Sequence, residues 1–239
     1  MTDVVERPAL VGNRWVLAGG IVYLLEWVAI IGTAMVGAGE NTGRTASVDD
    51  LLGSYLGHVD SIAFLAGWLT LVLLGRVLIF VGLRTALIES GAERHPLMDL
   101  AVLAAAVSVT LEMTTFGLAT AAADLADPDD PGAMVALDRA SEWMFATVGG
   151  GLAVAILCAV WCMWRSGLFS TALNVVGAVA GLGLVVAQLS MPPSLETVYL
   201  VAGFAPMVFW VWMLWAGVVL WRRTPKARAM SQIPTAVLQ

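Results

Sequence analysis

The chain contains 239 residues, of which 59% are hydrophobic and 13% charged, and its formal net charge is −6. Soluble domains average about 25% charged residues, so this composition argues against nucleic-acid binding, a secreted disulfide scaffold and a soluble nucleotide-binding enzyme. It predicts an all-α polytopic membrane protein, with the lipid bilayer as an expected partner.

Six apolar stretches are long enough to cross a membrane. The hydrocarbon core of a bilayer is about 30 Å thick and requires about 20 helical residues, and the backbone must be helical because lipid offers it no hydrogen-bond partners. The first stretch exceeds the roughly 7–15 apolar residues of a signal peptide, so we expect it to be retained. One six-helix domain over residues 1–239 is therefore expected, with spans at residues 15–38, 61–83, 97–122, 142–164, 168–188 and 197–221.

Basic and acidic residues fall on alternate connections between these spans. Basic residues tend to stay on the cytoplasmic side of a membrane, and here they lie before the first span, in the second and fourth connections and after the sixth span. Acidic residues gather in the other connections. The pattern predicts that both termini are cytoplasmic. The basic residues that carry this prediction are Arg7, Arg14, Arg84, Arg94, Arg165, Arg222, Arg223, Lys226 and Arg228.

Two of the acidic connections carry signs of local structure. Ser47 precedes Asp49 and Asp50, which is typical of a helix start with a hydroxyl cap and carboxylates in the first turn. Apolar residues follow on one side, so we expect a short amphipathic helix at the outer interface. In the other connection, turn-forming residues 127–132 precede a helical pattern that resumes at about Ala133.

Histidine and lysine are too scarce for several kinds of cofactor chemistry. His58 and His95 are expected on opposite sides of the membrane, which argues against a haem held by two histidines within the bundle. The single lysine, Lys226, follows the last span, so no retinal-type Schiff base is expected within the bundle. The chain lacks His-Glu-x-x-His and phosphate-loop motifs. We expect no cofactor and favour a non-enzymatic role.

A weak metal site could lie at the outer mouth of the bundle. His58 and Asp60 could supply two ligands at the start of the second span, with Asp138 or Glu142 completing the set. The alternative is that this pair forms a solvated cap on a helix start.

Three ionisable residues, Glu26, Arg76 and Glu112, lie deep within spans. Each costs about 2.5–3.5 kcal/mol or more near the bilayer centre, so such residues usually face a partner or a water-filled cavity. At about 1.5 Å per residue, the two glutamates lie at similar depth near the midplane. Arg76 lies lower, but its long side chain could rise to meet Glu26.

The first, third and fifth spans each carry a stripe of small and polar residues along one face. Glu26 lies in the stripe of the first span and Glu112 in that of the third, and the stripe of the fifth span runs from Ser170 through Asn174 to Gln188. Such stripes are expected where membrane helices touch or line a cavity, so the first, third and fifth spans are predicted to converge. The candidate ligand-binding or ion-binding residues are Glu26, Arg76, Glu112, Tyr23, Ser108, Thr115 and Asn174.

Two interpretations of this cluster stay open. In the first, Glu26 and Arg76 form a buried ion pair, Glu112 is a hydrogen-bonded carboxyl and the hydroxyls join the helices. In the second, a polar midplane cavity binds or conducts a small ligand, a cation or a proton. The deep tryptophans could wall a pocket for a hydrophobic ligand or pack against lipid; they are Trp27, Trp68, Trp210 and Trp212.

Two other functions compete with the cavity. The chain could be a structural or regulatory subunit that docks to partner subunits in a larger membrane complex, or an enzyme that acts on lipid. A lipid-acting enzyme would need one of the glutamates for acid–base work, together with an oriented water.

The layout resembles a broad group of uncharacterised six-helix bacterial membrane proteins. The likeness rests on Asn13-Arg14, the paired Gly19-Gly20, Leu51-Leu52 and the ending Leu220-Trp221-Arg222-Arg223. It covers most of the chain and implies a place in the bacterial inner membrane. It carries over no functional residue.

Overall fold

The fold is a bundle of long helices. The computed structural model describes residues 10–39, 42, 45–92 and 95–230, and these contain helices and no strands. In chain order the helices are α1 (Trp15–Leu24), α2 (Glu26–Ala34), α3 (Val48–Tyr55), α4 (Val59–Val72), α5 (Leu74–Glu89), α6 (Pro96–Asp124), α7 (Gly132–Ser166), α8 (Thr171–Leu189), a 3₁₀ helix (Pro193–Leu195), α9 (Glu196–Ala202) and α10 (Ala205–Met230).

Six of these helical stretches are long and apolar enough to cross a membrane, as predicted. The fourth stretch begins ten residues earlier than the expected span, at Gly132. Its first turns are still helical because the pattern resumes directly after the turn at 127–132, as the sequence indicated. The six stretches are Trp15–Ala34, Val59–Glu89, Pro96–Asp124, Gly132–Ser166, Thr171–Leu189 and Thr197–Thr224.

Three of the six stretches are interrupted part-way. The first breaks at Leu25, whose N–H donates to the Val22 carbonyl three residues back at 3.1 Å. The indole Nε1 of Trp68 donates to the Leu25 carbonyl at 2.8 Å, which gives this oxygen a second donor beside the backbone. The second stretch breaks at Leu73. The sixth breaks before Pro206, because proline lacks an N–H and its ring clashes with the carbonyl four residues earlier.

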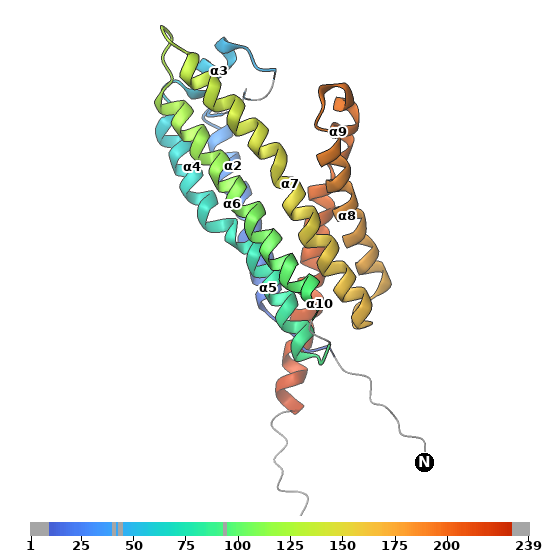
Figure 1. Ribbon diagram of the computed structural model, residues 1–239. Coiled ribbons are helices and arrows are strands. Elements are labelled where there is room, and N and C mark those ends of the chain that lie inside the picture. Colours follow the sequence, from blue (N-terminus) through green and yellow to red (C-terminus); the bar gives the residue numbers. More distant parts are fainter. Residues whose placement is uncertain (1–9, 40–41, 43–44, 93–94, 231–239) are drawn as a thin grey trace, which may run out of the picture.

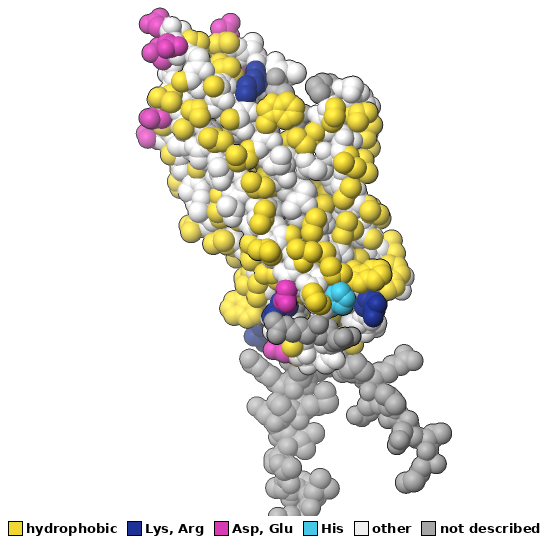
Figure 2. Space-filling view, viewed as in Figure 1, with side chains coloured by type: hydrophobic (Ala, Val, Ile, Leu, Met, Phe, Trp, Pro, Cys, Tyr) yellow, Lys and Arg dark blue, Asp and Glu magenta, His cyan; other side chains and the backbone are white. Residues whose placement is uncertain are grey.

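The bundle has two distinct ends (Figure 1). One end, here called the α3 end, carries α3 and the turn between α6 and α7; the other, here called the terminal end, holds the start of α1 and the end of α10. Acidic side chains gather at the α3 end, and most of the basic ones lie at the terminal end (Figure 2). This distribution agrees with the alternating charges of the sequence.

The terminal half is closely packed around two glycines. A Cβ atom added at Gly75 would lie 2.5 Å from the Gly19 carbonyl oxygen and 2.7 Å from the Tyr23 amide nitrogen, so α1 and α5 touch backbone to backbone. Beside this crossing, the fully buried rings of Phe80 and Phe209 stack with centroids 6.5 Å apart. Close packing in this half fixes α1 and α5 relative to each other.

The expected amphipathic helix at the α3 end is confirmed as α3. Ser47 caps it, accepting a hydrogen bond from the Asp50 N–H while the Asp50 carboxylate accepts one from the Ser47 N–H. The Ser47 hydroxyl also donates to the Asp50 carboxylate at 2.7 Å, and this bond, followed by that from the Ser47 N–H, lowers the pKa of Asp50. Tyr55 at the other end of α3 donates a 2.8 Å hydrogen bond to the buried carboxylate of Asp138 on α7. Burial, and then this carboxylate, raise the pKa of Tyr55.

Candidate functional site

A cavity of about 550 Å³ lies in the half of the bundle nearer the α3 end. Its walls come from α1, α2, α4, α6, α7, α8, α9 and α10, with Arg76 of α5 at its base. The cavity exists because α2 packs on α4 while α9 packs on α8, and α2 and α9 diverge from each other. Two of the helix interruptions, at Leu25 and before Pro206, fall beside it.

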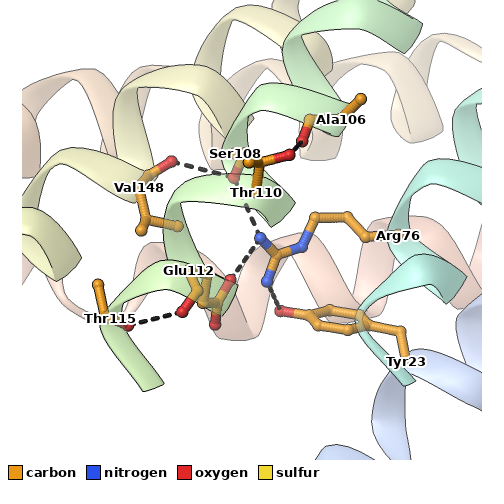
Figure 3. Close-up of polar contacts among 8 residues, drawn as sticks. All are labelled: Tyr23, Arg76, Ala106, Ser108, Thr110, Glu112, Thr115 and Val148. Carbon is orange, nitrogen blue, oxygen red and sulfur yellow. Dashed lines mark hydrogen bonds and ion pairs between the residues drawn. The ribbon is translucent and has the colours of Figure 1, made fainter. Parts of the chain in front are cut away.

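The base of the cavity is polar and centred on Arg76 (Figure 3). Its Nη2 donates to the Tyr23 hydroxyl at 2.9 Å, and its Nη1 donates to Ser108 Oγ at 3.1 Å and lies 2.7 Å from Glu112 Oε2. Ser108 in turn donates to the Val148 carbonyl at 3.1 Å, which joins α5, α6 and α7. Arg76 is 2% exposed and Glu112 is 7% exposed, so this is a buried ion pair.

The close contact of α1 and α5 places the arginine. Because Gly75 precedes Arg76 and touches the α1 backbone at Gly19 and Tyr23, the guanidinium meets the Tyr23 ring with Cζ 4.7 Å from the ring centroid. This is a cation–π geometry. The two glycines thus determine the position of both polar groups.

The ion pair of Arg76 with Glu26, part of one of the two interpretations of the sequence, does not form. The guanidinium pairs with Glu112, since Arg76 extends toward α6, and Tyr23 on α1 occupies the guanidinium's other side. Depth alone could not separate the two carboxyls because both lie near the middle of their spans.

Glu26 lies on the cavity wall as the first residue of α2 and is 6% exposed. Among the residues that the structure describes, it has no Lys, Arg or His partner within 4.0 Å. The cavity therefore holds one carboxyl in an ion pair, Glu112, and one without, Glu26.

Two further residues that line the cavity carry buried polar atoms without a hydrogen-bond partner in the described part of the chain. Trp210 Nε1 and Gln188 Oε1 are buried and have no hydrogen-bond partner among the described residues, and both side chains line the cavity. Trp210 also meets Trp27 edge to face, with ring centroids 5.3 Å apart and planes at 89°. Unpartnered buried polar atoms cost free energy, so their position in a cavity wall points to a bound molecule or water.

The mouth of the cavity is apolar and exposed. Five of the lining side chains are exposed on the outer surface of the bundle, and they come from α2, α7, α9, the α9–α10 junction and α10. Their exposed fractions run from 39% to 64%; they are Trp27, Phe145, Leu200, Phe204 and Met207. The cavity thus joins a buried polar base to an apolar side opening.

The predicted site residues form three groups: residues that line the cavity, residues buried beside it, and Asn174, which lies elsewhere. Tyr23, Glu26, Arg76 and Glu112 line the cavity. Ser108 and Thr115 are buried beside it: Ser108 binds Arg76, and Thr115 donates to the Glu112 carbonyl oxygen at 2.7 Å.

Asn174 is not in the cavity. It lies in the first turn of α8, near the terminal end, whereas the cavity meets α8 only from Leu184 to Gln188. The stripe of the fifth span runs along the length of α8. Only its end at Gln188 reaches the cavity. Asn174 is 3% exposed and its Oδ1 has no partner in the described part of the chain.

The suggested metal ligands His58 and Asp60 gain no third ligand. Within residues 10–39, 42, 45–92 and 95–230, no three His, Cys, Asp or Glu side chains come together as a metal site would require. Asp138, one expected partner, binds Tyr55 and lies 3.5 Å from Arg139 instead.

Sequence reasoning missed most of the mouth. Exposed apolar residues such as Leu200 and Phe204 look the same in sequence whether they face lipid or line an opening. Pro206 carried a usable signal, because a proline within an apolar span predicts an interruption. Of the deep tryptophans, Trp27 and Trp210 line the cavity, while Trp212 is fully buried and does not.

No protein family, curated protein or solved structure matches this chain. The chemistry of the cavity therefore carries the functional argument.

Proposed function

We propose that this protein binds an amphiphilic molecule that enters its cavity sideways from the hydrocarbon region of a membrane. The observation that carries the proposal is the continuity of one cavity from the buried polar base at Glu26 and Arg76 to the exposed apolar mouth at Phe204 and Met207. A ligand with a polar head and an apolar body would match both ends.

The proposal places the chain in the bacterial cytoplasmic membrane with both termini on the cytoplasmic side. Support comes from the basic residues of the terminal end, such as Arg14, Arg84 and Arg165, and from the acidic α3 end. In that setting the mouth opens at the depth of the lipid tails. Binding is favoured over conduction because the lining residues lie in the α3 half, and the base of the cavity is closed by Arg76 with its contacts to Tyr23, Ser108 and Glu112.

Photolabelling in lipid nanodiscs tests the proposal. The probe is a long-chain fatty alcohol that carries a diazirine on its chain, and mass spectrometry locates the labelled residues. We expect saturable labelling at Leu200, Phe204 and Met207. Two exposed residues away from the cavity, Leu71 and Leu103, provide the internal control for simple contact with lipid.

A cavity-filling variant completes the experiment. Ala187 lines the cavity, so Ala187→Trp should remove the labelling at the mouth while Leu71 and Leu103 are labelled as before. Equal, non-saturable labelling of all apolar surfaces, unchanged in Ala187→Trp, would refute the proposal.

A further inference from the structure

The cavity wall carries one carboxyl more than the buried ion pair uses. Arg76 and Glu112 lie 2.7 Å apart and neutralise each other, and the guanidinium is also bound by Tyr23 and Ser108. Glu26 remains, on the same wall and with no ion-pair partner among the described residues. An ionised Glu26 would leave the site with one uncompensated negative charge.

The lining is also rich in aromatic rings. Seven of the 24 lining residues are aromatic, against 8% of the whole chain. Trp27 follows Glu26 in α2 and meets Trp210 edge to face, and Tyr23 lies one turn earlier on α1. Aromatic faces attract cations through their quadrupole, and a cage of such rings recognises alkylated ammonium groups.

From the juxtaposition of the unpaired Glu26 carboxyl and the aromatic lining, we infer that the ligand is a lipophilic cation, an apolar molecule that carries one positive charge. The inference rests on the proposed function and names the class of molecule that the cavity accepts. The charge lies against Glu26 beside the Trp27–Trp210 pair, and the apolar body extends toward Phe204 and Met207.

Two unpartnered atoms provide hydrogen bonds beside the charge. Gln188 Oε1 would accept from an ammonium N–H, and Trp210 Nε1 would donate to an oxygen on the ligand. The donors of Arg76 do not supply an anion site of equal strength, because its two terminal nitrogens are bound by protein groups and only Nε lacks a partner in the described chain.

Two ions of matched size and opposite charge test the inference: tetraphenylphosphonium and tetraphenylborate. Binding of each to the purified full-length protein is measured by equilibrium dialysis in one detergent. Because both ions also enter detergent micelles, specific binding is defined as the part that Ala187→Trp removes. We expect the cation to bind at least about tenfold more tightly than the anion.

Charge and ring contributions are then separated by substitution. Glu26→Gln keeps the shape of the side chain and should weaken cation binding roughly tenfold or more while leaving anion binding unchanged or stronger. Trp27→Leu should weaken cation binding several-fold, since Leu retains apolar contact and loses the π face. Unchanged elution from a sizing column identifies the variants that remain folded.

The outcomes separate this inference from the proposed function. Equal specific binding of both ions, or cation binding that Glu26→Gln does not weaken, overturns the cationic class and leaves a general amphiphile site intact. Tighter binding of tetraphenylborate assigns the site to anions and also overturns the inference. Absence of specific binding for both ions overturns it as well, whereas the proposed function itself fails only if the fatty-alcohol probe does not label the mouth.

Discussion

The two halves of the bundle use the same small and apolar residues to opposite effect. In the terminal half, Gly19 and Gly75 bring α1 and α5 into backbone contact, and large rings fill the remaining space. In the α3 half, the helices diverge and leave a cavity of about 550 Å³. The boundary between the halves coincides with the deep charges. The role of each charge therefore depends on which half of the bundle it faces.

Glu112 and Glu26 illustrate this difference. Glu112 also lines the cavity, but it belongs to the packed seam, the contact of α1, α5 and α6 around Arg76, where its ion pair joins α5 to α6. Glu26 belongs to the open half, where it faces the cavity. We therefore expect the first carboxyl to contribute mainly to stability and the second mainly to binding.

The largest effect on stability is expected from removing the buried charge of Arg76. Arg76→Ala would leave Glu112 buried without its partner and should destabilise the protein by about 3–5 kcal/mol, as for other buried ion pairs that lose one member. Thermal or denaturant unfolding in detergent measures this loss. The double variant Arg76→Met with Glu112→Met should recover most of the stability, and a single variant as stable as the parent would contradict the assignment.

A smaller effect is expected from adding a methyl group at the α1–α5 crossing. The Cβ of Gly75→Ala would meet backbone atoms of Gly19 and Tyr23, so the helices must separate at a cost of about 1–3 kcal/mol. Gly32→Ala in α2 is the matched control, because nothing lies within 4 Å of a Cβ atom there. Equal effects of the two substitutions would show that the close contact is not required.

The attachment of α3 should be weaker again. Tyr55→Phe removes the hydrogen bond to Asp138, whose side chain is 1% exposed, and should cost about 1.5 kcal/mol. Faster hydrogen exchange confined to α3 and the facing part of α7 is the expected readout. Slower or unchanged exchange in α3 would contradict the role of this hydrogen bond.

Alkaline pH should weaken the same attachment. The folded state raises the pKa of Tyr55, so the protonated phenol is favoured on folding, and its contribution is complete below the ordinary tyrosine pKa of about 10. Above that pH the contribution is lost progressively as the folded-state pKa is approached. Hydrogen exchange in α3 should accelerate from about pH 10 upward, and Tyr55→Phe should lack this pH-dependent part.

The smallest effect on stability is expected at the open half. Glu26→Gln removes no ion pair, so the free energy of unfolding should change by less than about 1 kcal/mol. Unfolding under the conditions used for Arg76→Ala gives a direct comparison. A loss as large as that of Arg76→Ala would assign Glu26 to the packed seam.

Much of the architecture was predictable from the sequence, because the length of each apolar stretch and the charges of each connection are local properties of the chain. The six apolar helices and the capped α3 follow from residues that act locally. The partner of Arg76 did not follow, since two glutamates lie at similar depth and the choice depends on the Gly19–Gly75 contact. The mouth did not follow either, because an apolar side chain such as Phe204 carries no mark of whether a helix packs beside it.

A high-resolution structure of the protein in lipid nanodiscs tests most directly whether the cavity holds a ligand beside Glu26. We predict elongated density in the cavity that begins beside Glu26, runs along the Trp27–Trp210 pair and leaves through the mouth at Phe204. Dry packing of α2 against α9, with no cavity and no density beside Glu26, would contradict the account.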